Sequence, residues 1–193
     1  MKKSLYFIIL LSLLILFVAC SEKIGTIPKN YSYNYSNYLE YNFKKAGDIE
    51  GSFSFKYPKG WIVEKLPTWE ANPEKEASPD WGVELYKEGD KENKITILGI
   101  VGGVPVDESR GNTWEKQGLQ KSQLVVGDVN RGEVYSGLAE NKVRIVVLYY
   151  DRENPPGFES GWHLEAHVEV NKQFYNINKD EIWHILASVK KTK

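Results

Sequence analysis

The sequence predicts an α+β domain whose central sheet is covered by helices on both faces. Residues 52–63 (SFSFKYPKGWIV) alternate aromatic with small or charged side chains, the period-two pattern of strands with one buried face. Residues 94–104 and 143–150 are apolar almost throughout, which is typical of inner strands with both faces covered. A closing helix is predicted by apolar residues at helical spacing: Ile182, Ile185, Leu186 and Val189.

The N-terminus has the pattern of an export signal. Lys2 and Lys3 precede an apolar run that ends at Ala19, directly before Cys20. The residues Phe17-Val18-Ala19-Cys20 resemble the bacterial lipoprotein motif, although Phe17 stands where leucine is usual. This resemblance implies that residues 1–19 are a signal peptide and that Cys20 carries the lipid. An uncleaved N-terminal membrane anchor is the alternative. Both predict a protein held at the extracytoplasmic face of the cell membrane.

Composition restricts the classes of function. Of the 193 residues, 174 remain from Cys20 onward, which is enough for a single domain, expected over residues 39–193. Loss of Lys2 and Lys3 lowers the 25 basic residues to 23 against 26 acidic ones, a net charge of about −3. This balance argues against nucleic-acid binding. Because Cys20 is the only cysteine, the mature domain has no disulfide, thiol nucleophile or cysteine metal site.

Residues 20–38 are interpreted as the tether between lipid and domain, and they are rich in tyrosine. The expectation is that these rings lie over their own domain or near the membrane interface; stacking on sugar rings is the alternative. The remaining elements are expected in this order: a strand or helical turn at 39–43, a hairpin at 53–66 turning at Pro58-Lys59-Gly60, strands at 81–87 and 94–104, a helix at 113–121, strands at 124–129 and 133–139 turning at 130–132, strands at 143–150 and 162–170, and a helix capped by Asn178.

Two of these segments resemble the PsbP-like family, named for an extrinsic photosystem II subunit and shared by bacterial lipoproteins. They are the stretch from Phe53 to Trp61, with its Tyr-Pro-x-Gly-Trp motif, and the end of the closing helix, where Val189 replaces the family's aromatic residue. The resemblance implies an α/β/α sandwich with a mostly antiparallel sheet. It also implies a non-enzymatic role in docking to a larger complex, with no cofactor and no catalytic residues to carry over.

The strand expected at 162–170 (WHLEAHVEV) carries the clearest constellation of ligand-type residues. Alternation places His163, Glu165 and His167 on one face and apolar residues on the other. Glu165 with either histidine could chelate a divalent cation such as zinc. The alternative is a half-buried strand whose polar face is solvated.

Two long segments, 67–80 and 151–161, carry the expected interaction residues. Trp69 and Phe158 are candidates for contact with an envelope protein, or else they cover their own core. A lipoprotein that binds a small ligand or carbohydrate through Trp69, Trp81 and Trp114 is the second hypothesis. A hydrolase that uses acidic side chains of these segments is the third.

Overall fold

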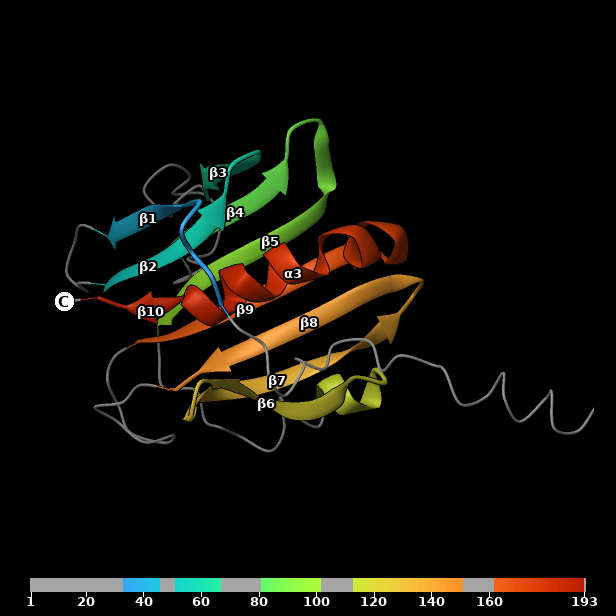
Figure 1. Cartoon of the computed structure of the whole chain (residues 1–193). Helices are drawn as coiled ribbons and strands as arrows, with labels where there is room; N and C mark the ends of the chain where they lie inside the picture. Colours follow the sequence, from blue (N-terminus) through green and yellow to red (C-terminus); the bar gives the residue numbers. More distant parts are fainter. Residues whose placement is uncertain (1–32, 46–50, 67–80, 102–112, 151–161, 193) are drawn as a thin grey trace, which may run out of the picture.

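The computed structural model describes residues 33–45, 51–66, 81–101, 113–150 and 162–192, and these form two antiparallel sheets and one long helix (Figure 1). The three-stranded sheet has the order β1-β2-β10, and the seven-stranded sheet has the order β3-β4-β5-β9-β8-β7-β6. The elements are β1 (Tyr38–Lys45), β2 (Gly51–Pro58), β3 (Trp61–Lys65), β4 (Trp81–Lys87), β5 (Asp90–Val101), β6 (Gln120–Val126), β7 (Val129–Ala139), β8 (Lys142–Tyr149), β9 (Trp162–Asn171), α3 (Lys172–Ser188) and β10 (Lys190–Lys191).

Strand β9 lies at the centre of the large sheet, between β5 and β8. The two apolar stretches read as inner strands, 94–104 and 143–150, correspond to these flanking strands. The sequence did not indicate that the strand with the histidines would be central. Its apolar side faces the main core, where Leu164, Ala166 and Val168 pack with residues of α3.

One face of the large sheet is covered by α3 and by the small sheet, as Figure 1 shows. Ile182, Ile185, Leu186 and Val189 are fully buried there, so the predicted apolar stripe is confirmed. On the other face, the described residues include only a helical turn at 113–116, followed by Leu119, which packs on Tyr135 and Val146. The described part of the chain therefore does not confirm a helical layer on both faces. Within it, no helix is long and apolar enough to cross a membrane.

The predicted hairpin at 53–66 is wrong, because β2 and β3 belong to different sheets. β2 pairs with β1 and β10, whereas β3 pairs with β4. The corner between them uses Gly60 at φ +92°, a conformation that side chains with a Cβ disfavour. The chain leaves the small sheet here and enters the edge of the large one, so Trp61 reaches the core as the first residue of β3.

Two elements after residue 112 differ from the expectation. The helix predicted over 113–121 is a single turn, which ends where Gly118 adopts φ +84° and its N–H bonds to the Glu115 carbonyl. The β6–β7 turn lies at residues 127–128, with Gly127 at φ +60°, and not at 130–132. Gly132 instead lies within β7, where a Cβ would collide with the Leu148 carbonyl of β8.

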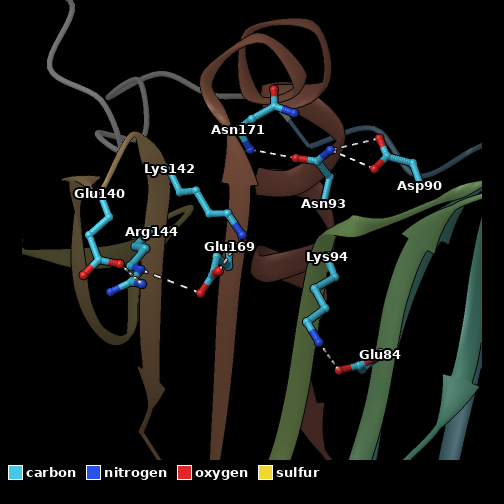
Figure 2. Close-up of polar contacts among 9 residues, drawn as sticks. All are labelled: Glu84, Asp90, Asn93, Lys94, Glu140, Lys142, Arg144, Glu169 and Asn171. Carbon is cyan, nitrogen blue, oxygen red and sulfur yellow. Dashed lines mark hydrogen bonds and ion pairs between the residues drawn. The ribbon is translucent and has the colours of Figure 1, made fainter.

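The N-cap of the closing helix lies seven residues before the predicted cap. Asn171 is the N-cap of α3, and its side chain accepts a hydrogen bond of 2.7 Å from the Phe174 N–H. Asn178 lies inside the helix, where its buried amide donates to the Phe174 carbonyl. Asn93 of β5 fixes the helix start: it accepts from the Asn171 N–H at 2.7 Å and donates to Asp90 (Figure 2).

Candidate functional site

The candidate site lies on the face of the large sheet that points away from α3, which we call the outer face. Alternation along β9 places His163, Glu165, His167 and Glu169 there, opposite the residues packed on α3. The strand register adds Leu98 of β5 and Leu148 of β8 on either side of Glu165.

The three predicted ligand residues come together as a hydrogen-bonded clamp. His163 Nε2 lies 2.8 Å from Glu165 Oε1, and His167 Nε2 lies 2.8 Å from Glu165 Oε2. An ionised carboxylate can only accept, so each imidazole must carry a hydrogen on Nε2. Glu165 is 2% exposed, and the expectation that this polar face is solvated is therefore wrong at its central residue. Its burial follows from its place in the middle strand.

Burial alone would raise the pKa of Glu165, because a carboxylate loses hydration energy in the interior. The hydrogen bonds from His163 and His167 outweigh this effect and lower the pKa to about 2. Glu165 is thus a buried carboxylate that stays ionised, with both oxygens bonded to imidazole nitrogens. Such a group stabilises the sheet, and it is poorly placed to transfer a proton at neutral pH.

The same geometry bears on the metal hypothesis. A cation chelated between Glu165 and the Nε2 atom of either histidine would need the lone pair of that nitrogen, whereas in the clamp each Nε2 carries a hydrogen directed at Glu165. Among the described residues, no group of three or more His, Cys, Asp or Glu side chains is arranged to hold a metal ion.

The tryptophans predicted as ligand-binding residues have different environments. Trp81 is 1% exposed and packs against Gly51, Gly99 and Trp162, so its assignment to a ligand surface is wrong. Trp114 is partly exposed on the helical turn at 113–116, with its ring centroid 4.9 Å from that of Tyr135 and 6.5 Å from that of His167. Trp114 therefore joins the outer face beside the clamp.

Trp69 and Phe158 lie outside the described residues, as do Asp151, Glu153, Glu159 and the acidic residues of 67–80. The strand ends next to these segments are described, and they meet at one end of the large sheet. Trp81 pairs with Gly99, and Trp162 pairs with Val101. The connections 67–80 and 151–161 both start and finish at this end, where β5 also ends, and we call it the loop end.

At the opposite end of the outer face, charged side chains neutralise one another across four strands (Figure 2). Lys94 of β5 bonds to Glu84 of β4 at 2.6 Å, and Glu169 of β9 bonds to Lys142 of β8 at 2.8 Å. Arg144 of β8 lies 3.7 Å from Glu169 and 3.1 Å from Glu140. Because the signs alternate along the sheet, this ladder presents little net charge to a ligand.

A second cluster, which the sequence did not indicate as a unit, lies on the solvent side of α3. Residues 33–38, which we call the strap, cross the helix at His184. The His184 ring centroid lies 5.3 Å from that of Tyr33, 5.5 Å from that of Tyr35 and 5.3 Å from that of Tyr38. The tyrosine-rich sequence was the available signal, but its partner lies about 150 positions away along the chain.

Comparison with known proteins gives a distant likeness in structure only. No family model matches the sequence, and no curated protein matches it. Among solved structures, the chain is similar to the cyanobacterial PsbP (CyanoP) of Synechocystis sp. PCC 6803, with a TM-score of 0.49 and 10% identity over 87% of this chain and 98% of that one. A protein from Bacteroides thetaiotaomicron VPI-5482 gives a TM-score of 0.38 and 14% identity over 73% of this chain and 45% of that one. One of these two solved structures is thus a PsbP, the protein for which the family that residues 53–61 resemble is named.

Proposed function

We propose that this chain is an extracytoplasmic lipoprotein that acts as a non-enzymatic docking module, with the loop end as its contact surface. The observation that carries the proposal is that two long connections, 67–80 and 151–161, start and finish at the same end of the sheet. These two connections contain the candidate contact residues Trp69 and Phe158. Large apolar side chains on loops at one end of a rigid sheet are a common basis for partner recognition.

The chemistry of the described polar groups supports a binding role over catalysis. Glu165 is held ionised between two histidines, and the glutamates of the charged ladder are paired with lysine or arginine. Each of these groups has a structural use. A general acid or base would instead need a pKa near the working pH and access to a substrate.

The proposed anchor is Cys20, for which the apolar run after Lys2 and Lys3 gives the support. Tyr33 is the first described residue, and the 13 steps from Cys20 to Tyr33 span at most about 45 Å when fully extended. A lipid on Cys20 would therefore keep the domain close to the membrane surface. Its docking partner is accordingly an envelope protein.

The docking proposal is tested by chemical crosslinking in native membranes followed by capture of the full-length protein. A partner captured in fixed stoichiometry should decrease with Trp69→Ala and with Phe158→Ala. Ile177→Ala is the matched control, because Ile177 is 74% exposed in the first half of α3, away from the loop end. Equal capture of the partner by the wild type and all three variants would contradict the assignment of the loop end as the contact surface.

Anchoring is tested separately with Cys20→Ser. The wild-type chain should partition into the membrane fraction with the mass of a lipid-modified Cys20, and the variant should lack both the added mass and the processing at this site. An unmodified Cys20 in the wild-type protein would contradict lipidation, whatever the outcome of the docking experiment.

One observation supports the second candidate, binding of a small ligand or carbohydrate. Trp114 is partly exposed beside His167, and an aromatic ring next to a hydrogen-bonding side chain suits a sugar. Titration of a glycan panel while tryptophan fluorescence is recorded tests this role. A saturable change that Trp114→Ala removes would favour ligand binding over docking.

A further inference from the structure

The strap, residues 33–38, is held on α3 by two polar contacts as well as by its rings. The Asn34 N–H donates to His184 Nε2 at 3.3 Å, and the Tyr35 hydroxyl donates to the His184 carbonyl at 3.0 Å. The rings of Tyr33 and Tyr35 stack on each other with centroids 6.2 Å apart. His184 of α3 therefore contacts most residues of the strap.

The partners of His184 assign its tautomer. Its Nδ1 lies 2.7 Å from the Asp180 carbonyl oxygen, which can only accept, so Nδ1 carries the hydrogen. Its Nε2 faces the Asn34 N–H, which can only donate, so Nε2 must keep its lone pair. The docked strap thus requires a neutral imidazole in one tautomer. Protonation at Nε2 would place its new N–H opposite the Asn34 N–H, so that two hydrogen-bond donors would face each other.

We propose that His184 is a proton-sensitive latch, which holds the strap on α3 when neutral and releases it when protonated. Histidine is the side chain whose charge ordinarily changes between about pH 5 and pH 8, so the latch would respond to mild acidification. The latch involves this chain alone and is independent of the lipid on Cys20. If Cys20 is the anchor, as proposed above, release would add the residues of the strap to the segment between the lipid and the domain.

The charged and titratable groups around the latch come from the strap itself and from α3, β2, β7 and β8. Within the strap, burial raises the pKa of Tyr33 to about 12 and that of Tyr35 further, so both phenols stay neutral across the relevant range. On α3, the carboxylates of Asp180 and Glu181 act on Tyr38. The remaining groups are Lys56 of β2, whose Nζ lies 5.1 Å from the Tyr35 ring centroid, Arg131 of β7 and Tyr149 of β8.

Two effects oppose release. An imidazolium would be attracted to the tyrosine rings and to the two carboxylates. The hydrogen bond acts in the other direction, because the Asn34 N–H loses its acceptor and meets a positive charge. The direction of the pH response therefore shows whether these attractions or the loss of the Asn34 hydrogen bond dominates. The proposal requires release in acid.

Hydrogen–deuterium exchange of the full-length protein tests the latch. Peptides that cover residues 33–38 are compared at about pH 8 and about pH 5, after correction for the intrinsic pH dependence of exchange, with peptides of α3 as the internal reference. The strap should lose protection roughly three- to tenfold in acid, the ratio that corresponds to one lost hydrogen bond. Unchanged or increased protection at the lower pH would overturn the proposal.

Two variants separate His184 from other groups. His184→Gln retains a side-chain acceptor for Asn34 but does not titrate, and its strap should have the same protection at both pH values. Tyr35→Phe removes only the hydroxyl contact, so its strap should be less protected throughout while keeping the pH response. A His184→Gln strap that loosens in acid as the wild type does would show that another group is responsible. The wild-type comparison decides the proposal even if the glutamine docks poorly.

Discussion

The indole of Trp61 donates a hydrogen bond of 2.7 Å to the carboxylate of Glu181, which joins the first residue of β3 to the middle of α3. Trp61 belongs to the Tyr-Pro-x-Gly-Trp motif, and Glu181 directly precedes the end of the closing helix, the other segment that resembles the PsbP-like family. Lys87 completes the junction, with an ion pair of 3.0 Å to Glu181 and its Nζ 5.7 Å from the Trp61 ring centroid. The two segments are thus parts of one structural junction.

Trp61→Phe should lower the free energy of unfolding by about 3 kcal/mol, because it removes a hydrogen bond to a charged group and part of a buried ring. Glu181→Gln keeps an acceptor for the indole and should cost about 1 kcal/mol or less. Urea denaturation of the two variants measures both values. A Glu181→Gln protein as unstable as Trp61→Phe would show that the ion pair with Lys87 dominates the junction.

The clamp around Glu165 predicts a specific loss of stability in acid. The pKa of Glu165 is about 2 in the folded protein and near 4.5 when the chain is unfolded, so its contribution is complete above about pH 4.5 and is lost as the pH falls toward 2. The difference in pKa corresponds to a contribution on the order of 3 kcal/mol. Stability measured from neutral pH to about pH 2.5 should therefore fall more steeply for the wild type than for Glu165→Gln.

Other carboxylates with lowered pKa values, such as Glu133 and Glu169, also contribute to the loss of stability in acid. The test of the clamp is therefore the difference between the acid stability curves of the wild type and Glu165→Gln. Glu84→Gln removes an acidic residue from the charged ladder and is the matched control, which should follow the wild-type curve closely. Parallel acid curves for the wild type and Glu165→Gln would contradict the clamp.

Local patterns predicted the strands and the buried stripe of the helix well. Trp81–Lys87 matches the expected strand, and the apolar residues of α3 are buried as their spacing indicated. Such features depend on which face of an element is apolar, and the sequence states this directly. Helix ends are less determined: Asn178 with Glu181 has the pattern of a capping box, yet Asn171 is the cap because Asn93 of a distant strand bonds to its N–H.

Long-range placement limited the rest of the prediction. Nothing along residues 162–170 distinguishes an edge strand from the central one, and the burial of Glu165 depends on the strands to either side. The corner at Gly60 has the local signature of a hairpin turn, but strand pairing sends β2 and β3 into different sheets. The contact between the strap and His184 likewise depends on tertiary packing.

Zinc should not stabilise the domain through the clamp. Chelation of zinc between Glu165 and the Nε2 atom of His163 or His167 would displace the hydrogen bond from that nitrogen and leave a buried carboxylate less satisfied. The melting temperature at neutral pH should therefore stay constant at saturating zinc, and the double variant His163→Ala with His167→Ala should be less stable with or without the metal. A rise with zinc that the double variant abolishes would establish the metal site and refute this prediction.

The β6–β7 hairpin offers a test of how glycines with different roles respond to the same substitution. Gly132 pairs with Leu124 on one side and Tyr149 on the other, and an alanine Cβ there would collide with the Leu148 carbonyl. Gly127 in the turn has φ +60° and open space around the position of a Cβ. Gly132→Ala should cost about 3 kcal/mol, because backbone of two strands must shift, and Gly127→Ala about 1 kcal/mol for its conformation alone. Urea denaturation gives both values. A larger loss of unfolding free energy for Gly127→Ala than for Gly132→Ala would show that the tight contact of this hairpin lies in its turn and not between its strands.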